Sequence, residues 1–253
     1  MLAPNKGKKL ETIVDGVTYL RIPIKTRLIQ VGDNLMELLK EYALPHIMPG
    51  DMLFVSEKIV CICQNRIIHR DKVRMSWLAR LLAKMVRNYA GTPQFRGLGH
   101  GTAPAMQLLI EEAGYLRVLF AAFISAITRP FGISGAFYYL VGKQAKSIDC
   151  PMSWTIEEFK EYAKRAPLKP NKVAREIRDR YGIETVIIDA NYRGAFSLGK
   201  STSTISEKFI RSLVRDNPAG QDSEMTPFFL VRTVQHSVLD NYNIQAVSLQ
   251  SRS

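Results

Sequence analysis

The spacing of apolar and polar residues near the start of the chain predicts a strand, a helix and a second strand in succession. Residues 17–24 predict the first strand. Residues 35–42 carry apolar side chains at intervals of three and four, as on one face of an amphipathic helix. Residues 52–63 are a nearly continuous apolar run and predict a buried strand. Pro45 and Pro49 end the helix and enforce an extended turn before that strand.

Further along, amphipathic segments typical of helices alternate with shorter apolar runs typical of strands. Helices are expected at residues 76–89, 104–113, 118–127, 157–165, 172–181 and 203–214. Further strands are expected at residues 184–189 and 227–234. Thr102 suits the start of the helix at residues 104–113, and Gly182 suits the end of the helix at residues 172–181. The mixture predicts an α/β (α+β) protein with two lobes.

The two ends of the chain differ from the part between them. Residues 1–12 and 244–253 are predicted to be flexible tails around a single domain of residues 13–243. The polar, lysine-rich start lacks the apolar stretch of a secretory signal. The three cysteines have no zinc-type spacing, which indicates free thiols in a reducing compartment. A cytoplasmic protein is therefore expected.

The net charge of +12 predicts attraction to polyanions such as nucleotides, acidic metabolites or anionic lipid, without choosing among them. No zinc-finger, helix-turn-helix or aromatic RNA-binding pattern is present, so specific nucleic-acid recognition is not expected. The apolar run at residues 118–127, between Arg117 and Arg129, is too short to span a bilayer. A helix lying on a membrane surface is one interpretation of this run, and a buried helix is the favoured one.

Charged residues at the ends of apolar runs are the candidates for chemistry. Asp189 follows the strand predicted at residues 184–189, and Asp149 follows a second apolar stretch. Two carboxylates brought together at strand ends would suit a hard cation that bridges nucleotide phosphates. From the residues alone, capping of the following turns is the favoured explanation for both aspartates. Lys58 lies within the apolar run at residues 52–63, facing either a polar site or the solvent side of an edge strand.

Residues 194–201 match the phosphate-loop pattern, with four residues between Gly194 and Gly199 and then Lys200 and Ser201. The bulky Phe196 and Leu198 are poor residues for wrapping backbone amides around phosphates, and the loop does not follow its strand directly. A phosphate-loop NTPase is therefore only an alternative function.

A polar segment at residues 216–227 precedes the last predicted strand. Gln221 and Glu224 are candidates for contact with a metal or a substrate amine. A structural turn is the favoured interpretation, because Asn-Pro and Ala-Gly pairs are ordinary turn formers.

Short motifs in a consistent order connect the chain to one known family. Gly32-Asp33 and Gly50-Asp51 each stand two residues before a leucine, and the second is followed by Val55 and by Lys58-Ile59-Val60. These motifs resemble the gamma-glutamyl ligases of the deazaflavin coenzyme F420. Further similar segments, spread between residues 22 and 234, are residues 106–112, Ile148-Asp149, residues 167–177 and residues 186–191.

This resemblance implies a mixed-sheet fold with two lobes, a homodimer and a ligase reaction. In such a reaction the terminal phosphate of GTP activates a carboxylate acceptor as an acyl phosphate, which the amine of an amino acid such as L-glutamate then attacks. The acceptor would be an anionic small molecule. The resemblance assigns catalytic and metal-binding roles, with Mg²⁺ or Mn²⁺, to Asp149 and Asp189. It assigns nucleotide contacts to Thr26, Arg27, Leu28, Ile29 and Lys58.

The chain departs from the family pattern at three places. The family carries a metal-binding threonine where this chain has Ala190, and a second lysine where it has Ile62. The family also often has acidic residues around the proline of the segment that is Leu168-Lys169-Pro170-Asn171-Lys172 in this chain. A divergent member that binds a nucleotide or an acidic metabolite without catalysis is therefore an alternative to an active ligase. A third hypothesis is a partner of membranes or nucleic acid that uses the basic helices.

Overall fold

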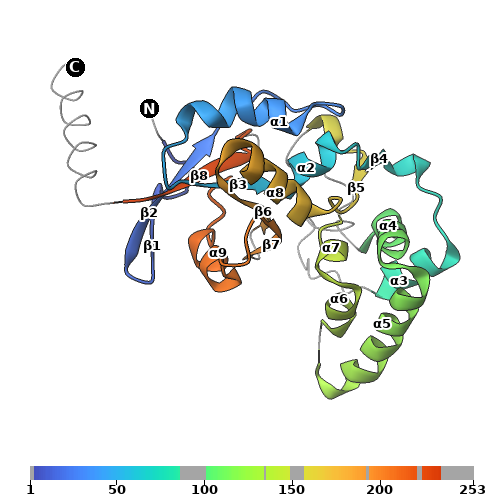
Figure 1. The fold of residues 1–253 in the computed structure, drawn as a ribbon. Helices are drawn as coiled ribbons and strands as arrows, with labels where there is room; N and C mark the ends of the chain where they lie inside the picture. The colour runs from blue at the N-terminus through green and yellow to red at the C-terminus, as the bar shows by residue number, and fades with distance from the viewer. Residues whose placement is uncertain are drawn as a thin grey trace.

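The computed structural model describes residues 3–85, 101–133, 135–148, 157–191, 194–220 and 224–234. These residues form a six-stranded mixed sheet with helices on both faces and a second, mainly helical lobe beside it (Figure 1). The strand order is β1-β2-β8-β3-β6-β7, with β3 and β6 parallel and the other neighbours antiparallel. The strands are β1 Glu11–Val14, β2 Val17–Ile24, β3 Met52–Ser56, β6 Glu184–Asn191, β7 Gly194–Lys200 and β8 Phe228–Thr233. The predicted α/β (α+β) fold with two lobes is confirmed.

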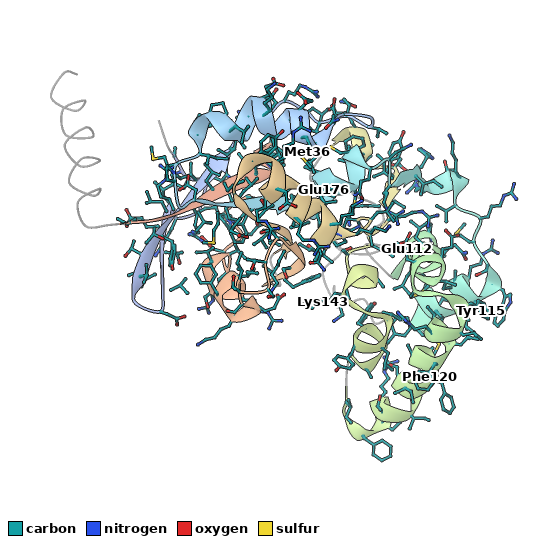
Figure 2. All side chains as sticks on the ribbon, viewed as in Figure 1. Met36, Glu112, Tyr115, Phe120, Lys143 and Glu176 are labelled. Carbon is teal, nitrogen blue, oxygen red and sulfur yellow. The ribbon has the colours of Figure 1, made fainter. Side chains whose placement is uncertain are left out.

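The helical lobe is built on a small two-stranded sheet. Its strands are β4 Ile67–His69 and β5 Tyr162–Lys164, which pair antiparallel. Its helices are α3 Trp77–Met85, α4 Ala103–Ala113, α5 Tyr115–Thr128, α6 Ala136–Val141 and α7 Lys143–Lys146. They share a core separate from that of the large sheet. In Figure 2 the labelled side chains of Tyr115 and Phe120 point outward from α5, away from the sheet.

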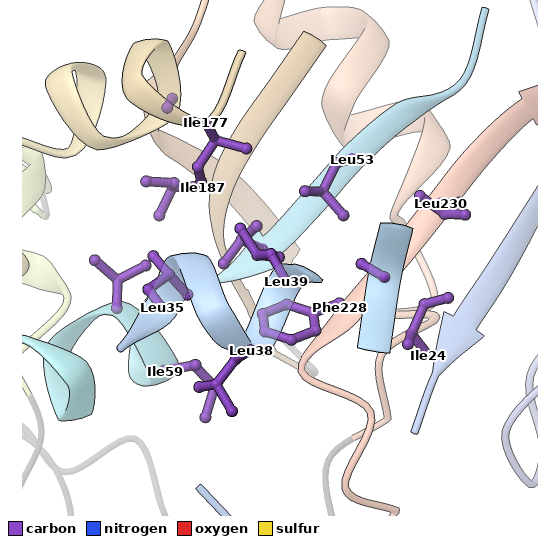
Figure 3. Close-up of a cluster of buried hydrophobic side chains, with 14 of the residues drawn as sticks. Ile24, Leu35, Leu38, Leu39, Leu53, Ile59, Ile177, Ile187, Phe228 and Leu230 are labelled. Atoms are coloured by element: carbon purple, nitrogen blue, oxygen red, sulfur yellow. The ribbon is translucent and has the colours of Figure 1, made fainter. Parts of the chain in front are cut away.

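The large sheet is buried on both faces because its central strands are apolar at successive positions. On one face Leu53, Val55, Phe228 and Leu230 pack against α1 Leu35–Leu38, α2 Glu57–Cys63 and α8 Pro170–Tyr181 (Figure 3). On the other face, Phe54 stacks on Phe229 with ring centroids 4.8 Å apart, and α9 Glu207–Leu213 covers them. Alternate residues of each strand thus serve different cores, as the period of two in a strand requires.

Capping residues place several helix ends where the sequence predicts them. The Thr102 hydroxyl oxygen accepts a hydrogen bond from the Ala105 N–H at the start of α4. Gly182 follows α8 with a φ of 69°, a conformation that glycine adopts without a steric penalty. The helix predicted at residues 35–42 begins as α1 and continues through a π-helical turn, Leu39–Ala43, and a 3₁₀ turn, Leu44–His46.

The strand predicted at residues 52–63 is wrong beyond Ser56, where β3 ends and α2 begins. An apolar run of this length fits a strand or one buried helical turn, and its period alone does not separate the two. Cys61, which is fully buried, and Cys63, which is partly exposed, therefore both lie in α2. Lys58 lies in the first turn of α2 and not within a strand.

Three predicted helices also change. Residues 157–165 form a 3₁₀ turn, Glu157–Phe159, followed by β5 instead of a helix. The helix predicted at residues 203–214 starts later, at Glu207, because Ser206 caps it through a hydrogen bond from the Phe209 N–H. The sequence favours a buried helix at residues 118–127. These residues lie in α5, but its buried residues are Val118 and Ala121, so the expected burial is wrong for most of the helix. The remaining elements are 3₁₀ turns, Arg70–Lys72 and Arg129–Phe131.

Residues near the start of the chain contact the polar segment before β8. The Asn5 side-chain amide donates hydrogen bonds to the Pro218 carbonyl and the Thr226 hydroxyl, both at 2.8 Å. The Lys8 ammonium donates to the Asp216 carbonyl at 2.6 Å. Residues 244–253, the second predicted tail, lie outside the described residues. Within the described part of the chain, no helix is long and apolar enough to cross a membrane.

Candidate functional site

The carboxyl ends of three strands of the large sheet lie side by side, and the candidate residues come just after these strand ends. Phe228, at the start of β8, pairs antiparallel with Ile24 at the end of β2 and with Val55 near the end of β3. The parallel pair β3–β6 ends with Ser56 opposite Ile188. β2, β3 and β6 therefore run in one direction and finish together. Ligand sites of open α/β sheets lie at such carboxyl ends.

The segment after β2 carries the predicted nucleotide contacts Thr26, Arg27, Leu28 and Ile29. Thr26 is buried, and its N–H donates to the Met225 carbonyl at 2.8 Å. Ile29 is buried in the core beneath the segment, while Leu28 is partly exposed and Arg27 exposed. These anchors hold the backbone of the segment along the sheet edge.

Arg27 is held by an ion pair with Asp33. Its two terminal nitrogens donate to the Asp33 carboxylate oxygens at 2.7 and 2.8 Å. The hydrogen bond from Arg27 lowers the pKa of Asp33, and the Gln30 N–H, which donates to the same carboxylate, lowers it further. Asp33, in the first Gly-Asp pair of the sequence, thus fixes the loop between β2 and α1.

The junction of β3 and α2 brings Lys58 to the same edge. The Ser56 N–H donates to the Pro227 carbonyl at 2.9 Å, which ties the junction to the segment before β8. Lys58 is two residues beyond Ser56 and partly exposed. Asp189 is one residue beyond Ile188, the parallel partner of Ser56. The structure therefore places Lys58 and Asp189 just past the same pair of strand residues.

Asp189 lies where β6 keeps only one neighbouring strand. β6 continues to Asn191, two residues further than predicted, but β3 ends opposite Ile188. From Asp189 onward β6 pairs only with β7, Asp189 opposite Phe196. Asp189 is partly exposed. Asp189 therefore lies where β6 no longer pairs with β3.

Asp149, the other predicted metal ligand, lies outside the described residues. The two residues before it, Ser147 and Ile148, are buried. The ammonium of Lys164 donates to the Ser147 carbonyl and, at 2.9 Å, to a Glu57 carboxylate oxygen. Since Glu57 directly precedes Lys58, this buried contact connects residue 147 with the β3–α2 junction.

Asn217 belongs to the Asn-Pro pair that the sequence predicts to form a turn before β8. Its side-chain N–H group donates to the Ala190 carbonyl at 3.3 Å and to the Gly220 carbonyl at 2.7 Å. Two carbonyl partners fix the orientation of the amide, because carbonyls only accept. The side-chain oxygen is buried without a hydrogen-bond partner among the described residues. An amide oxygen is a hard donor, so the neighbourhood of Asp189 has ligand chemistry that fits Mg²⁺ or Mn²⁺.

The described residues contain no group of three or more histidine, cysteine, aspartate or glutamate side chains arranged to hold a metal. Neither described cysteine belongs to such a group. Burial raises the pKa of the Cys63 thiol to about 12, and burial followed by the nearby Glu57 raises that of Cys61. The candidate ligands near the strand ends are the oxygen atoms of Asp189 and Asn217.

The phosphate-loop interpretation of residues 194–201 is wrong. Gly194–Lys200 is strand β7, which pairs antiparallel with β6 and does not lead directly into a helix. A Cβ atom on Gly199 would lie 2.5 Å from the Pro170 carbonyl oxygen and 2.7 Å from the Asn171 nitrogen. Close packing of β7 on the start of α8 explains this glycine.

The structure shows where Ile62 and Ala190, two of the departures from the family pattern, lie. Ile62 is fully buried in the core beneath α2, so its position serves packing. Ala190 lies in β6 opposite Ala195, and its carbonyl accepts the hydrogen bond from Asn217.

Comparison with known proteins assigns the chain to a family. Residues 23–227 match the family model described as F420-0:Gamma-glutamyl ligase, a range that contains every candidate site residue. The chain belongs to this family, which indicates ligase activity of the gamma-glutamyl ligase type. No curated protein matches the chain.

Proposed function

We propose that this protein uses GTP and a divalent metal to add an amino acid such as L-glutamate to a carboxylate acceptor. The observation that carries the proposal is the convergence of Thr26–Ile29, Lys58 and Asp189 at one sheet edge in a chain of the ligase family. The family description names F420-0, which is the acceptor in this proposal, and the net charge of +12 suits an anionic molecule.

The reaction consists of two balanced transfers. An oxygen of the acceptor carboxylate attacks the terminal phosphorus of GTP, and the bond to the bridging oxygen breaks to release GDP. The amine of the amino acid then attacks the acyl phosphate carbon, so that inorganic phosphate leaves and an amide and one proton remain. Phosphoryl transfer is catalysed mainly by positioning and by charge stabilisation.

Each group of site residues has a separate task in this proposal. The backbone of Thr26–Ile29 binds the nucleotide, and the Lys58 ammonium balances phosphate charge. Asp149 and Asp189 hold Mg²⁺ or Mn²⁺, which neutralises the phosphates and the charge that develops during transfer. The Asn217 side-chain oxygen, beside Ala190, is a further candidate ligand.

Product formation tests the proposal directly. The protein is incubated with GTP, L-glutamate, F420-0 and either Mg²⁺ or Mn²⁺, and the products are analysed by mass spectrometry. We expect GDP, phosphate and an acceptor heavier by one glutamyl residue, with each product requiring all components. GTP hydrolysis that is independent of glutamate and acceptor would contradict a ligase reaction.

A nucleotide- or metabolite-binding protein without catalysis is the second candidate. Ala190 and the buried Ile62, which replace a metal-binding threonine and a lysine of the family, favour it. Binding of GTP with metal, without any product in the same incubation, would select this alternative.

A further inference from the structure

One face of α5 is apolar and exposed. Val118 and Ala121 are the buried residues of this helix. Large apolar side chains at intervals of three and four residues face solvent instead, with Leu116 81% and Phe123 63% exposed. We call the exposed set the α5 face; it comprises Leu116, Leu119, Phe120, Phe123 and Ile127. Isolated exposed apolar residues are ordinary, but a contiguous set marks an interaction surface.

The α5 face continues over the end of a projecting hairpin. α5 and α6 pack against each other, and in Figure 1 the pair extends away from the large sheet. Phe131 and Ile133, in the connection after α5, are exposed, Phe131 by 78%. Tyr139 on α6 is 82% exposed. Figure 2 shows Phe120 pointing outward from this projection. The shape is convex, and aromatic side chains lie along and beyond its apolar helix.

The charged residues of the segment that carries the α5 face are all basic. Between Glu112 and Asp149 the sequence contains Arg117, Arg129, Lys143 and Lys146 but no aspartate or glutamate. Arg117 and Arg129, at either end of the face, are exposed and form no ion pair with a described carboxylate. An apolar aromatic face with basic flanks is complementary to a surface that is apolar inside and anionic outside.

We propose that the α5–α6 hairpin docks the protein on an anionic lipid membrane. The α5 face and Phe131 insert among the lipid headgroups, and Arg117 and Arg129 contact phosphate groups. α5 has 14 residues, a length of about 21 Å against a hydrocarbon core of about 30 Å. The helix therefore lies in the interface and does not span the bilayer.

A second copy of this chain fits the face less well. In a twofold dimer the same patch meets itself, so each copy would bring Arg117 and Arg129 to an interface without acidic partners on this segment. A membrane supplies the missing negative charge.

Vesicle flotation tests the proposal. The full chain is mixed with vesicles of phosphatidylcholine, with or without phosphatidylglycerol, at low and at physiological salt. We expect flotation with the phosphatidylglycerol vesicles only, and weaker flotation at the higher salt. The double variant Phe120→Ser/Phe123→Ser should not float and should remain in the unbound fraction. Arg117→Gln/Arg129→Gln should bind more weakly by about 25-fold at low salt, since each basic residue contributes about fivefold.

Ile13→Ser is the matched control, because Ile13 is 72% exposed and lies on β1, an end strand of the large sheet that is away from the α5–α6 hairpin (Figure 1). It should float like the wild type, and all variants should keep the wild-type melting temperature. Light scattering of the wild type and of the double phenylalanine variant identifies the alternative occupant. A change from dimer to monomer would show that the face joins two copies and would overturn membrane docking. Failure of the wild type to float with anionic vesicles, or undiminished flotation of the phenylalanine variant, would overturn it as well.

Discussion

Asp189 lies in β6 just beyond the point where the parallel strand β3 ends. The β3–β6 ladder stops at Ser56 and Ile188, beyond which β3 gives way to α2 and β6 pairs only with β7. Lys58 on one side and Asp189 on the other supply opposite charges there, which is the chemistry that a metal-bound nucleotide requires. The Asn217 side-chain oxygen adds a buried acceptor without a partner among the described residues.

A prediction at this scale separates packing from phosphate binding at Gly199. Gly199→Ala forces a Cβ atom against the backbone of Pro170 and Asn171, so the free energy of unfolding should fall by about 1–3 kcal/mol. Urea unfolding measures this change. Gly182→Ala is the comparison, since a Cβ atom there meets nothing within 4 Å and only the positive φ opposes it, at a cost of about 1 kcal/mol. Unchanged stability of Gly199→Ala together with lost GTP binding would revive the phosphate-loop interpretation.

Among the secondary-structure elements, the sequence predicts those with a helical period or with a short apolar run between polar residues. α8 is found within a few residues of its predicted bounds because its buried residues follow a helical period, and β2, β6 and β8 are found because their apolar runs are as short as a strand. α2 is missed because every residue from Ile59 to Ile62 is buried, which removes the period. β5 is missed because three residues that pair with a distant strand leave no local signal.

Lys164 illustrates a contact that no local pattern reveals. It lies in β5, more than one hundred residues from Glu57 in sequence, yet both side chains are almost fully buried and form an ion pair. This pair joins the helical lobe to the junction that carries Lys58. Its sequence neighbours predict only a short helix at residues 157–165.

Removing one partner of this pair should be costly. Lys164→Met leaves the Glu57 carboxylate buried without this counter-charge, so we expect a loss of about 3–5 kcal/mol in the free energy of unfolding. The double variant Glu57→Leu/Lys164→Met removes both charges and should recover most of that loss. Urea denaturation of both variants and of Glu57→Leu gives the coupling between the two side chains. Additive losses would show that the pair does not act as a unit.

For the whole molecule, topology decides which distant residues meet. From the sequence, a binding site is expected at the ends of the strands, and the resemblance to the family supplies the roles of Thr26–Ile29, Lys58 and Asp189. Their convergence depends on β8, which is the last strand of the described residues but lies between β2 and β3. No local pattern specifies that placement, because it follows from long-range pairing across the sheet. The exposure of α5 is equally a property of the whole lobe, since the helix is apolar enough to be buried.

Acid sensitivity is a second property at this scale. Burial acts to raise the pKa values of Asp216 and Glu207, but ion pairs and hydrogen bonds with Arg21, and with Ser197 and Lys143, outweigh it and lower both. The pKa of Asp33 is lowered as well. A folded-state pKa below the unfolded one means that protons bind the unfolded chain more tightly. The stabilisation is therefore complete above the ordinary carboxyl pKa values and is lost as pH falls from about 5 toward 2.

Chemical denaturation at several pH values checks this expectation. The wild type should lose stability steadily below about pH 5. Asp216→Asn should be less stable by about 1 kcal/mol at neutral pH, because the carboxylate is partly exposed, and should approach the wild type near pH 2. An Asp216→Asn variant that differs from the wild type equally at both pH values would show that ionisation of Asp216 does not contribute.

The central claim is that the sheet edge at Asp189 binds a nucleotide through a metal, and a thermal-shift titration with GTP tests it most directly. The melting temperature is measured with GTP alone and with GTP plus Mg²⁺ or Mn²⁺, for the wild type and for Asp189→Asn. Asp179→Asn is the control, because Asp179 is an exposed aspartate on α8 paired with Arg178. We predict a metal-dependent rise in the wild type and in Asp179→Asn that is absent in Asp189→Asn. An equal rise in Asp189→Asn, or no rise in the wild type with either metal, would contradict the account.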